Sequence, residues 1–260
     1  LRAESQKITA AKPELRDAEK EVTLLGRSTL LAAEIARDYA ALDAVWTTWA
    51  VDHMKPYGID DREKAAYTAQ AARWKEFVNL QKEEAAQNAL AEEAAQERKL
   101  LVLKAAAGLD EKVANLRGKE TEARSKASLA ATKQAADYWE AQFEKIKDPK
   151  PDDIWARNVT AQRDLTLAKR AEGDAGVAFG RAQQTLNADD PHLKELRAAW
   201  LLAGLKAMRS ESTLNLLSVD FEISKREGLG ANDPDLPALK KERESLLQKI
   251  KDLDEAIGKP

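Results

Sequence analysis

The sequence predicts an all-α fold, an elongated antiparallel helical bundle with coiled-coil character. Charged residues make up 33% of the 260 residues and aromatic residues only 5%, a composition typical of long helices. Apolar residues recur at alternating spacings of three and four along several segments, which places them on one helix face. No comparable run alternates with period two, so no strand is predicted. Because 43% of the residues are apolar, we expect a folded chain rather than a disordered one.

Prolines and glycines set the predicted helix ends in the N-terminal half. Pro13 opens the first helix, which closes at residues 56–58. A second helical run begins at Asp60 or Asp61 and meets no proline until Pro149. Its weak points are Gly108 and Gly118. Without a break the run would form one rod on the order of 130 Å long, and a break at the first of these glycines would leave rods of roughly 70 Å.

A firm break at residues 148–153 separates this half from three further predicted helices. The three helices are expected over about 153–188, from 191 to Gly228 or Gly230, and 234–258. The division predicts an N-terminal long-helix hairpin region at 1–147 and a C-terminal three-helix region at 148–260. The alternative is one continuous domain.

Asp-Pro pairs stand at the start of these C-terminal helices, at Asp148, Asp190 and Asp233. An Asp before the first turn accepts a hydrogen bond from an unpaired amide, and a Pro at the first helical position needs no amide hydrogen. A calcium loop starting at Asn187 would require Gly at its sixth position and Glu at its twelfth. Those positions hold His192 and Ala198. The pattern therefore predicts helix capping and no metal site. Near Asp148 the helix is expected to begin later, at 151–153.

Several predicted helices carry a seam of apolar side chains that should face a partner helix, either within the chain or in another chain. On the first helix the seam is Ile35, Tyr39, Leu42, Trp46, Trp49 and His53. Before the central break it is Thr132, Ala136, Trp139, Phe143 and Ile146. On the last helix it is Leu239, Arg243, Leu246, Ile250, Leu253 and Ile257. The six tryptophans, which follow helical spacing, are expected in the core: Trp46, Trp49, Trp74, Trp139, Trp155 and Trp200.

The helix that begins near Pro191 has the longest seam. Its members are Leu193, Leu196, Trp200, Ala203, Ala207, Ser210, Leu214, Leu217 and Phe221. A flank of Leu201, Leu205 and Met208 widens it. We expect this face to form the core of the C-terminal half, covered by the helices before and after it.

Two stretches of small residues predict close helix packing. The Ala-rich segment 85–96 should let neighbouring helices approach closely. Gly173, Gly176 and Gly180 share roughly one helix face, which predicts close packing or a local bend, with a hinge as the alternative.

No motif in the sequence assembles catalytic chemistry. The chain has no cysteine and only two histidines, His53 and His192, which excludes thiolate chemistry and a Cys/His zinc site. The G-x-G at 228–230 has no third glycine and no preceding strand, so a helix end is predicted there rather than a phosphate loop. Adjacent acidic residues such as Glu83 and Glu84 point in different directions on a helix. We therefore predict no enzyme, with no catalytic, cofactor-binding or metal-binding residue and no cofactor.

One resemblance to a known family lies in the C-terminal third. Residues 193–227 form a long Leu-rich stretch with a Leu-Leu-Ser step at 216–218, and LPALKKERESLLQKIKDLDEAI follows at 236–257. This arrangement resembles the end of the helical, porin-like periplasmic region of large bacterial mechanosensitive channels. The resemblance implies an envelope location and a force- or solute-sensing extension of a membrane protein. It brings no catalytic residues with it.

These observations predict a non-enzymatic structural or interaction module. We expect the periplasmic or extracytoplasmic helical domain of a bacterial envelope membrane protein. The alternative is a cytoplasmic coiled-coil scaffold or adaptor. The chain begins at Leu1, so we expect a piece of a longer protein, with any membrane part outside it. The net charge of −3 argues against nucleic acid, and protein partners or self-association are expected.

Overall fold

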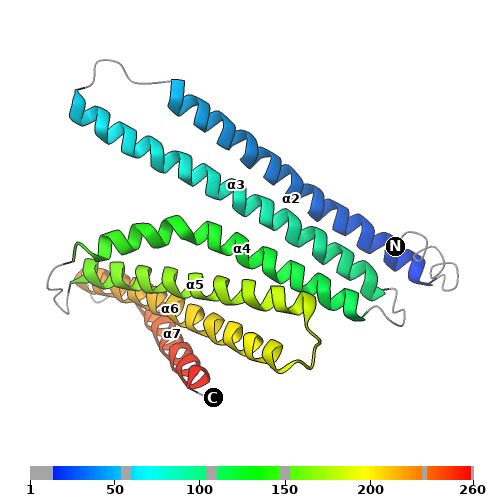
Figure 1. Ribbon diagram of the computed structural model, residues 1–260. Coiled ribbons are helices and arrows are strands. Elements are labelled where there is room, and N and C mark those ends of the chain that lie inside the picture. The colour runs from blue at the N-terminus through cyan, green and yellow to red at the C-terminus, as the bar shows by residue number, and fades with distance from the viewer. Residues whose placement is uncertain (1–13, 54–59, 104–109, 147–152, 230–232, 259–260) are drawn as a thin grey trace. The chain divides into compact units, whose positions relative to one another are not determined.

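The computed structural model describes residues 14–53, 60–103, 110–146, 153–229 and 233–258. Within these ranges the chain forms six helices and no strand, which confirms the all-α prediction (Figure 1). The helices are α2 (Glu14–His53), α3 (Asp61–Leu103), α4 (Asp110–Phe143), α5 (Ile154–Thr185), α6 (Pro191–Leu229) and α7 (Leu236–Ile257). None of these six helices is both long and apolar enough to cross a membrane. The predicted helix boundaries at Pro13, at 56–58, at Asp148 and at Gly230 lie outside the described residues.

Aspartates cap three of the helices, as the sequence predicts. The Asp60 carboxylate accepts from the amide of Glu63 at 2.8 Å, and the Glu63 carboxylate accepts from the amide of Asp60 at 3.2 Å. This reciprocal pair is a capping box. Asp153 accepts from the amide of Ala156 at 3.0 Å, and Asp190 accepts from that of His192 at 2.8 Å. The carboxylates of the helix-start motifs therefore satisfy backbone amides.

The prediction that Asp233 and Pro234 begin the last helix is wrong by two residues. Asp233 instead opens a turn, in which its carboxylate accepts from the amide of Asp235 at 2.9 Å. The same carboxylate also binds Arg226 of α6, at 3.0 Å. With Asp233 engaged there, α7 begins at Leu236. This Asp-Pro pair therefore turns the chain before the helix starts.

Consecutive helices run antiparallel, which confirms that part of the prediction. In α2 and α3, Asp52 pairs with Lys75 at 2.6 Å near one end. Close to the other end, Gly26 lies beside Gln96. In α6 and α7, Arg209 pairs with Asp254 and Arg243 with Asp220. Coiled-coil character stays a prediction.

The run from Asp61 is not one rod. Arg98 of α3 pairs with Glu120 of α4 at 3.0 Å, and Glu92 pairs with Arg124 at 2.7 Å. The two helices therefore lie side by side in opposite directions, and the chain reverses between Leu103 and Asp110. The predicted weak point Gly108 lies outside the described residues.

Gly118 is no weak point of the helix, because α4 continues through it. It lies instead where α4 meets α5. A Cβ on Gly118 would come within 2.6 Å of the carbonyl oxygen of Gly180, and a Cβ on Gly180 within 2.6 Å of the amide nitrogen of Glu122. Only glycines allow the two backbones to come this close. Gly180 thus confirms the close packing predicted for the glycine face of α5.

Helices α6 and α7 share a small core. Val219 and Ile223 of α6 are buried with Leu236 of α7, and Leu239 and Leu246 pack against them. The predicted α7 seam is confirmed, since its apolar members are buried or half-buried. On α6 the prediction is only partly right, because Leu193 and Ala207 are buried but other members of the predicted face are exposed. The exposed members are Leu201, Met208 and Phe221.

The chain divides into two compact units. One contains Leu1–Ala131 and Gly176–Leu196, and the other contains Thr132–Ala175 and Arg197–Pro260. Helices α4, α5 and α6 each contribute one part to each unit. The predicted boundary between 147 and 148 stays a prediction.

Candidate functional site

The outer face of α2 is a stripe of exposed apolar side chains, of which Tyr39, Leu42 and Trp46 also line a shallow hollow with Gln81 of α3. We define it by Leu24, Leu25, Leu31, Ile35, Tyr39, Leu42, Val45, Trp46 and Trp49. These side chains are between 46% and 70% exposed. The stripe includes most of the seam that the sequence predicts to face a partner helix.

The opposite face of α2 carries small side chains and packs against α3. Its members are Gly26, Ala33, Ala40, Ala44 and Thr47, all of them buried or half-buried. A Cβ on Gly26 would lie 2.7 Å from the side chain of Gln96. Helix α3 in turn buries alanines of the predicted Ala-rich segment, including Ala89 and Ala95. Helix α2 therefore uses its small residues for packing within the chain and leaves its large ones outside.

Aromatic rings stack along the C-terminal end of the outer face. The rings of Trp46 and Trp49 are 5.1 Å apart and inclined by 20°. Those of Trp49 and His53 are 4.8 Å apart and inclined by 14°. Nδ1 of His53 donates to the carbonyl oxygen of Trp49 at 2.8 Å, which holds the last ring of the stack in place. The stack gives the face a broad, pre-ordered aromatic surface.

The prediction that the tryptophans lie in the core is wrong for four of the six. Trp46, Trp49, Trp74 and Trp155 are exposed, while Trp139 and Trp200 are half-buried. Helical spacing identifies a shared face but does not tell whether that face turns inward, so the pattern alone did not separate the two cases.

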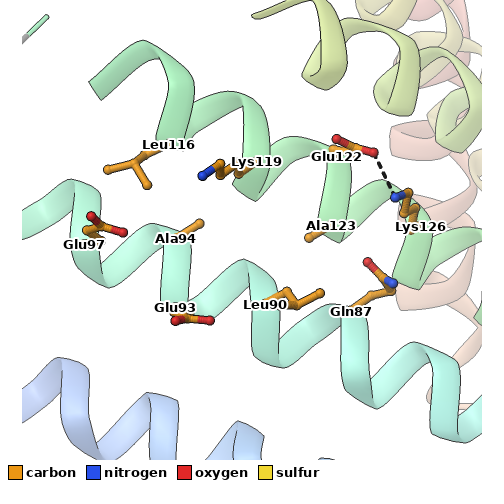
Figure 2. A pocket seen from close by; sticks show the side chains of 10 residues that line it. All are labelled: Gln87, Leu90, Glu93, Ala94, Glu97, Leu116, Lys119, Glu122, Ala123 and Lys126. Atoms are coloured by element: carbon orange, nitrogen blue, oxygen red, sulfur yellow. Dashed lines mark ion pairs between the residues drawn. The ribbon is translucent and has the colours of Figure 1, made fainter. Parts of the chain in front are cut away.

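A second feature is a groove between α3 and α4 with a volume of about 340 Å³ (Figure 2). Helix α3 contributes Gln87, Leu90, Glu93, Ala94 and Glu97. Helix α4 contributes Leu116, Lys119, Glu122, Ala123 and Lys126. Three carboxylates and two ammonium groups lie among leucine and alanine side chains, so the lining is nearly balanced in charge.

Glu122 is the most strongly held of the charges that line this groove. Its carboxylate accepts from Lys126 at 2.8 Å, from Arg181 at 2.9 Å and from Gln184 at 2.7 Å. Burial acts to raise the pKa of Glu122, but these three hydrogen bonds outweigh it and lower the pKa to about 2. A general acid or base works best with a pKa near the working pH. Glu122 therefore stabilises the contact of α4 with α5.

The two histidines lie apart and serve no common site. His53 belongs to the ring stack of α2, and His192 is an exposed residue 3.6 Å from Glu195 in the first turn of α6. Across the described ranges, no group of three or more His, Asp or Glu side chains is placed to hold a metal ion.

Sequence reasoning found the central part of the outer face but missed Leu24, Leu25, Leu31 and Val45, which widen it. A second signal was present in the sequence. Gly26, Ala33, Ala40, Ala44 and Thr47 recur at spacings of seven, seven, four and three, which marks a competing face suited to close packing.

The groove and the outer face differ in what they can do. The groove holds charges that already pair with one another, whereas the outer face presents large apolar side chains to solvent. No protein-family model, curated protein or solved structure matches the chain.

Proposed function

We propose that this chain is a non-enzymatic helical interaction module and that the outer face of α2 is its binding surface. One observation carries the proposal: nine large apolar side chains, three of them aromatic, lie exposed in a row on a single helix. The surface suits another helix, because its spacing of three and four matches the way helices pack along a seam.

The size of this face supports binding. Monomeric proteins rarely expose a continuous apolar patch of more than a few hundred Å². The aromatic side chains alone carry about 150–250 Å² each. Left in water, such a face would favour nonspecific association, so a specific partner is the simpler account of its presence.

The proposal of no enzymatic activity rests on the chemistry of the titratable groups. Glu122 is ionised and engaged by three donors. Neither His53 nor His192 lines the groove between α3 and α4. The outer face itself offers the indole and phenol groups of Trp46, Trp49 and Tyr39, which bind by stacking and apolar contact.

We further propose that the module is the extracytoplasmic helical part of a bacterial envelope membrane protein. The support is the resemblance carried by residues 193–227 and 236–257. The long α6 followed by the charged α7 is compatible with it.

Photo-crosslinking from the outer face tests the binding proposal. A photoreactive amino acid replaces Leu42 in the chain produced in its native cell, and the matched control replaces Leu247, an exposed leucine of α7. We expect a discrete adduct from position 42 and none from position 247. Absence of any adduct at position 42, with the protein folded, would overturn the proposal.

The location is tested separately by fusing the chain, in its native context, to a phosphatase that is active only outside the cytoplasm. Activity would support the envelope proposal. An inactive fusion, with the protein present in the cytoplasm, would favour the cytoplasmic scaffold or adaptor.

A further inference from the structure

We propose that the outer face of α2 binds the same face of a second copy of this chain, with the two helices antiparallel. This inference rests on the proposed function, because it names the partner of the binding surface described there. It is carried by the spacing of the seam, the positions of the acidic residues beside it and the order of large and small side chains along it.

The seam has the spacing of a two-stranded coiled coil. Tyr39, Trp46 and His53 occupy one set of core positions, seven residues apart, and Ile35, Leu42 and Trp49 occupy the other. All six are exposed in the single chain. Upstream, Leu25 and Ala32 continue the set that contains Tyr39, and Ser28 continues the set that contains Ile35. In an antiparallel pair, each layer of the core places a residue of the Tyr39 set on one copy opposite a residue of the Ile35 set on the other copy.

Acidic residues beside the seam disfavour a parallel pair. Asp38 lies on one flank of the seam and Asp43 on the other, five residues later. In a parallel pair, Asp38 of each copy would face Asp43 of the other copy, which would create two Asp–Asp contacts. Arg37 lies 2.9 Å from Asp38 and weakens this repulsion without supplying a positive charge to Asp43.

One antiparallel register avoids all such contacts. With Tyr39 of one copy level with Leu42 of the other, Asp38 comes opposite Val45 and Asp43 opposite Ala36. Sliding one copy by seven residues in one direction would set Asp38 against Asp38. Sliding it the other way would set Asp43 against Asp43. Like charges directly opposed across an interface are unfavourable, so the charges select the central register.

In its outer layers the same register matches large side chains with small ones. The layers on either side of the centre are Ile35 with Trp46, Ala32 with Trp49, and Ser28 with His53. The aromatic half of each face thus covers the small-residue half of the other, which is the alternation that close packing needs.

The exposed area is sufficient for a stable pair. A standard interface buries about 800 Å² on each partner. Nine large apolar side chains that are about half or more exposed supply an area of that order.

Sedimentation of the purified chain gives the first test. We expect a monomer–dimer equilibrium over about 1–100 μM. Leu42→Glu, which would place a charge at the centre of the pair, should weaken dimerisation about tenfold or more. The matched control Leu247→Glu replaces an exposed leucine on α7 and should leave the equilibrium unchanged. A chain that stays monomeric throughout this range would overturn the proposal.

Thiol crosslinking tests the orientation, and the absence of cysteine from the sequence makes each introduced thiol unique. Ala32→Cys and Trp49→Cys, both at exposed positions, are mixed and treated with a short bifunctional thiol reagent. We expect crosslinked dimers in the mixture and little product from either variant alone. Mixing Ala32→Cys with Leu247→Cys is the control and should give none. Efficient crosslinking of Trp49→Cys to itself would show a parallel pair and contradict the proposal.

The outcomes separate this inference from the proposed function. A monomeric chain that still gives a discrete adduct with a different protein from position 42 would overturn the second copy as partner and leave the binding surface intact. Loss of both the dimer and every adduct would remove both proposals.

Discussion

Glu122 shows at the scale of one residue how charge holds two helices together. Three donors, one from α4 and two from α5, meet its carboxylate. The resulting lowered pKa means that the folded protein favours the ionised form more strongly than the unfolded chain does. The carboxylate therefore links the stability of the α4–α5 contact to pH.

We predict that Glu122→Gln lowers the free energy of unfolding near neutral pH. The pKa of about 2 lies below the ordinary value of 4.5, so the stabilisation is present above about pH 4.5 and is lost as the pH falls towards 2. Urea unfolding at several pH values should show that the difference in unfolding free energy between Glu122→Gln and wild type disappears over that range. Glu93→Gln, an exposed residue of the same groove, should stay within about 0.5 kcal/mol throughout. If the difference in unfolding free energy between Glu122→Gln and wild type stayed constant with pH, this account would be contradicted.

The contact of Gly118 with Gly180 gives a second prediction at the residue scale. Gly180→Ala places a methyl group 2.6 Å from the amide nitrogen of Glu122, so α4 and α5 must separate. We expect a loss of about 1–3 kcal/mol in the free energy of unfolding. Gly228→Ala is the control, because nothing lies within 4 Å of its Cβ position, and it should be neutral or slightly stabilising. Equal effects of the two substitutions would show that the helices do not meet at the glycines.

At the scale of helices, the sequence predicted the buried face of α7 well and that of α2 incompletely. Helix α7 has one apolar seam, so its buried face follows from spacing alone. Helix α2 has two seams, one of large residues and one of small residues. Local spacing does not decide between them, because the choice depends on α3, whose alanines allow close approach. Helix starts at Asp60, Asp153 and Asp190 were predictable because capping is local.

Helix α6 allows a test of which part of its predicted face is core. Ile223 is buried in the contact with α7, whereas Leu201 is exposed. Ile223→Ala should cost about 2–5 kcal/mol of unfolding free energy, and Leu201→Ala should stay within about 0.5 kcal/mol. Chemical denaturation measures both. If the costs were reversed, the flank that the sequence predicted to be buried would be the true core.

At the scale of the whole molecule, self-association would link stability to concentration. A pair formed only by folded chains raises the unfolding midpoint as the protein concentration rises. We predict such a rise for the wild type and for Leu247→Glu, and a clearly smaller rise for Leu42→Glu. Thermal melts over a hundredfold range of concentration would measure it. A concentration-independent wild type would contradict the antiparallel pair.

The central claim is that α2 packs within the chain through its small residues and leaves its large ones for a partner. Denaturant unfolding of Ala44→Leu and Leu42→Ala, at a dilution where the chain is a monomer, tests it most directly. Ala44 is buried against α3 and Leu42 is exposed. We predict that Ala44→Leu costs about 1–3 kcal/mol through overpacking, while Leu42→Ala stays within about 0.5 kcal/mol of wild type. A tolerated Ala44→Leu with a Leu42→Ala cost of about 2–5 kcal/mol would show that the large seam is the buried one.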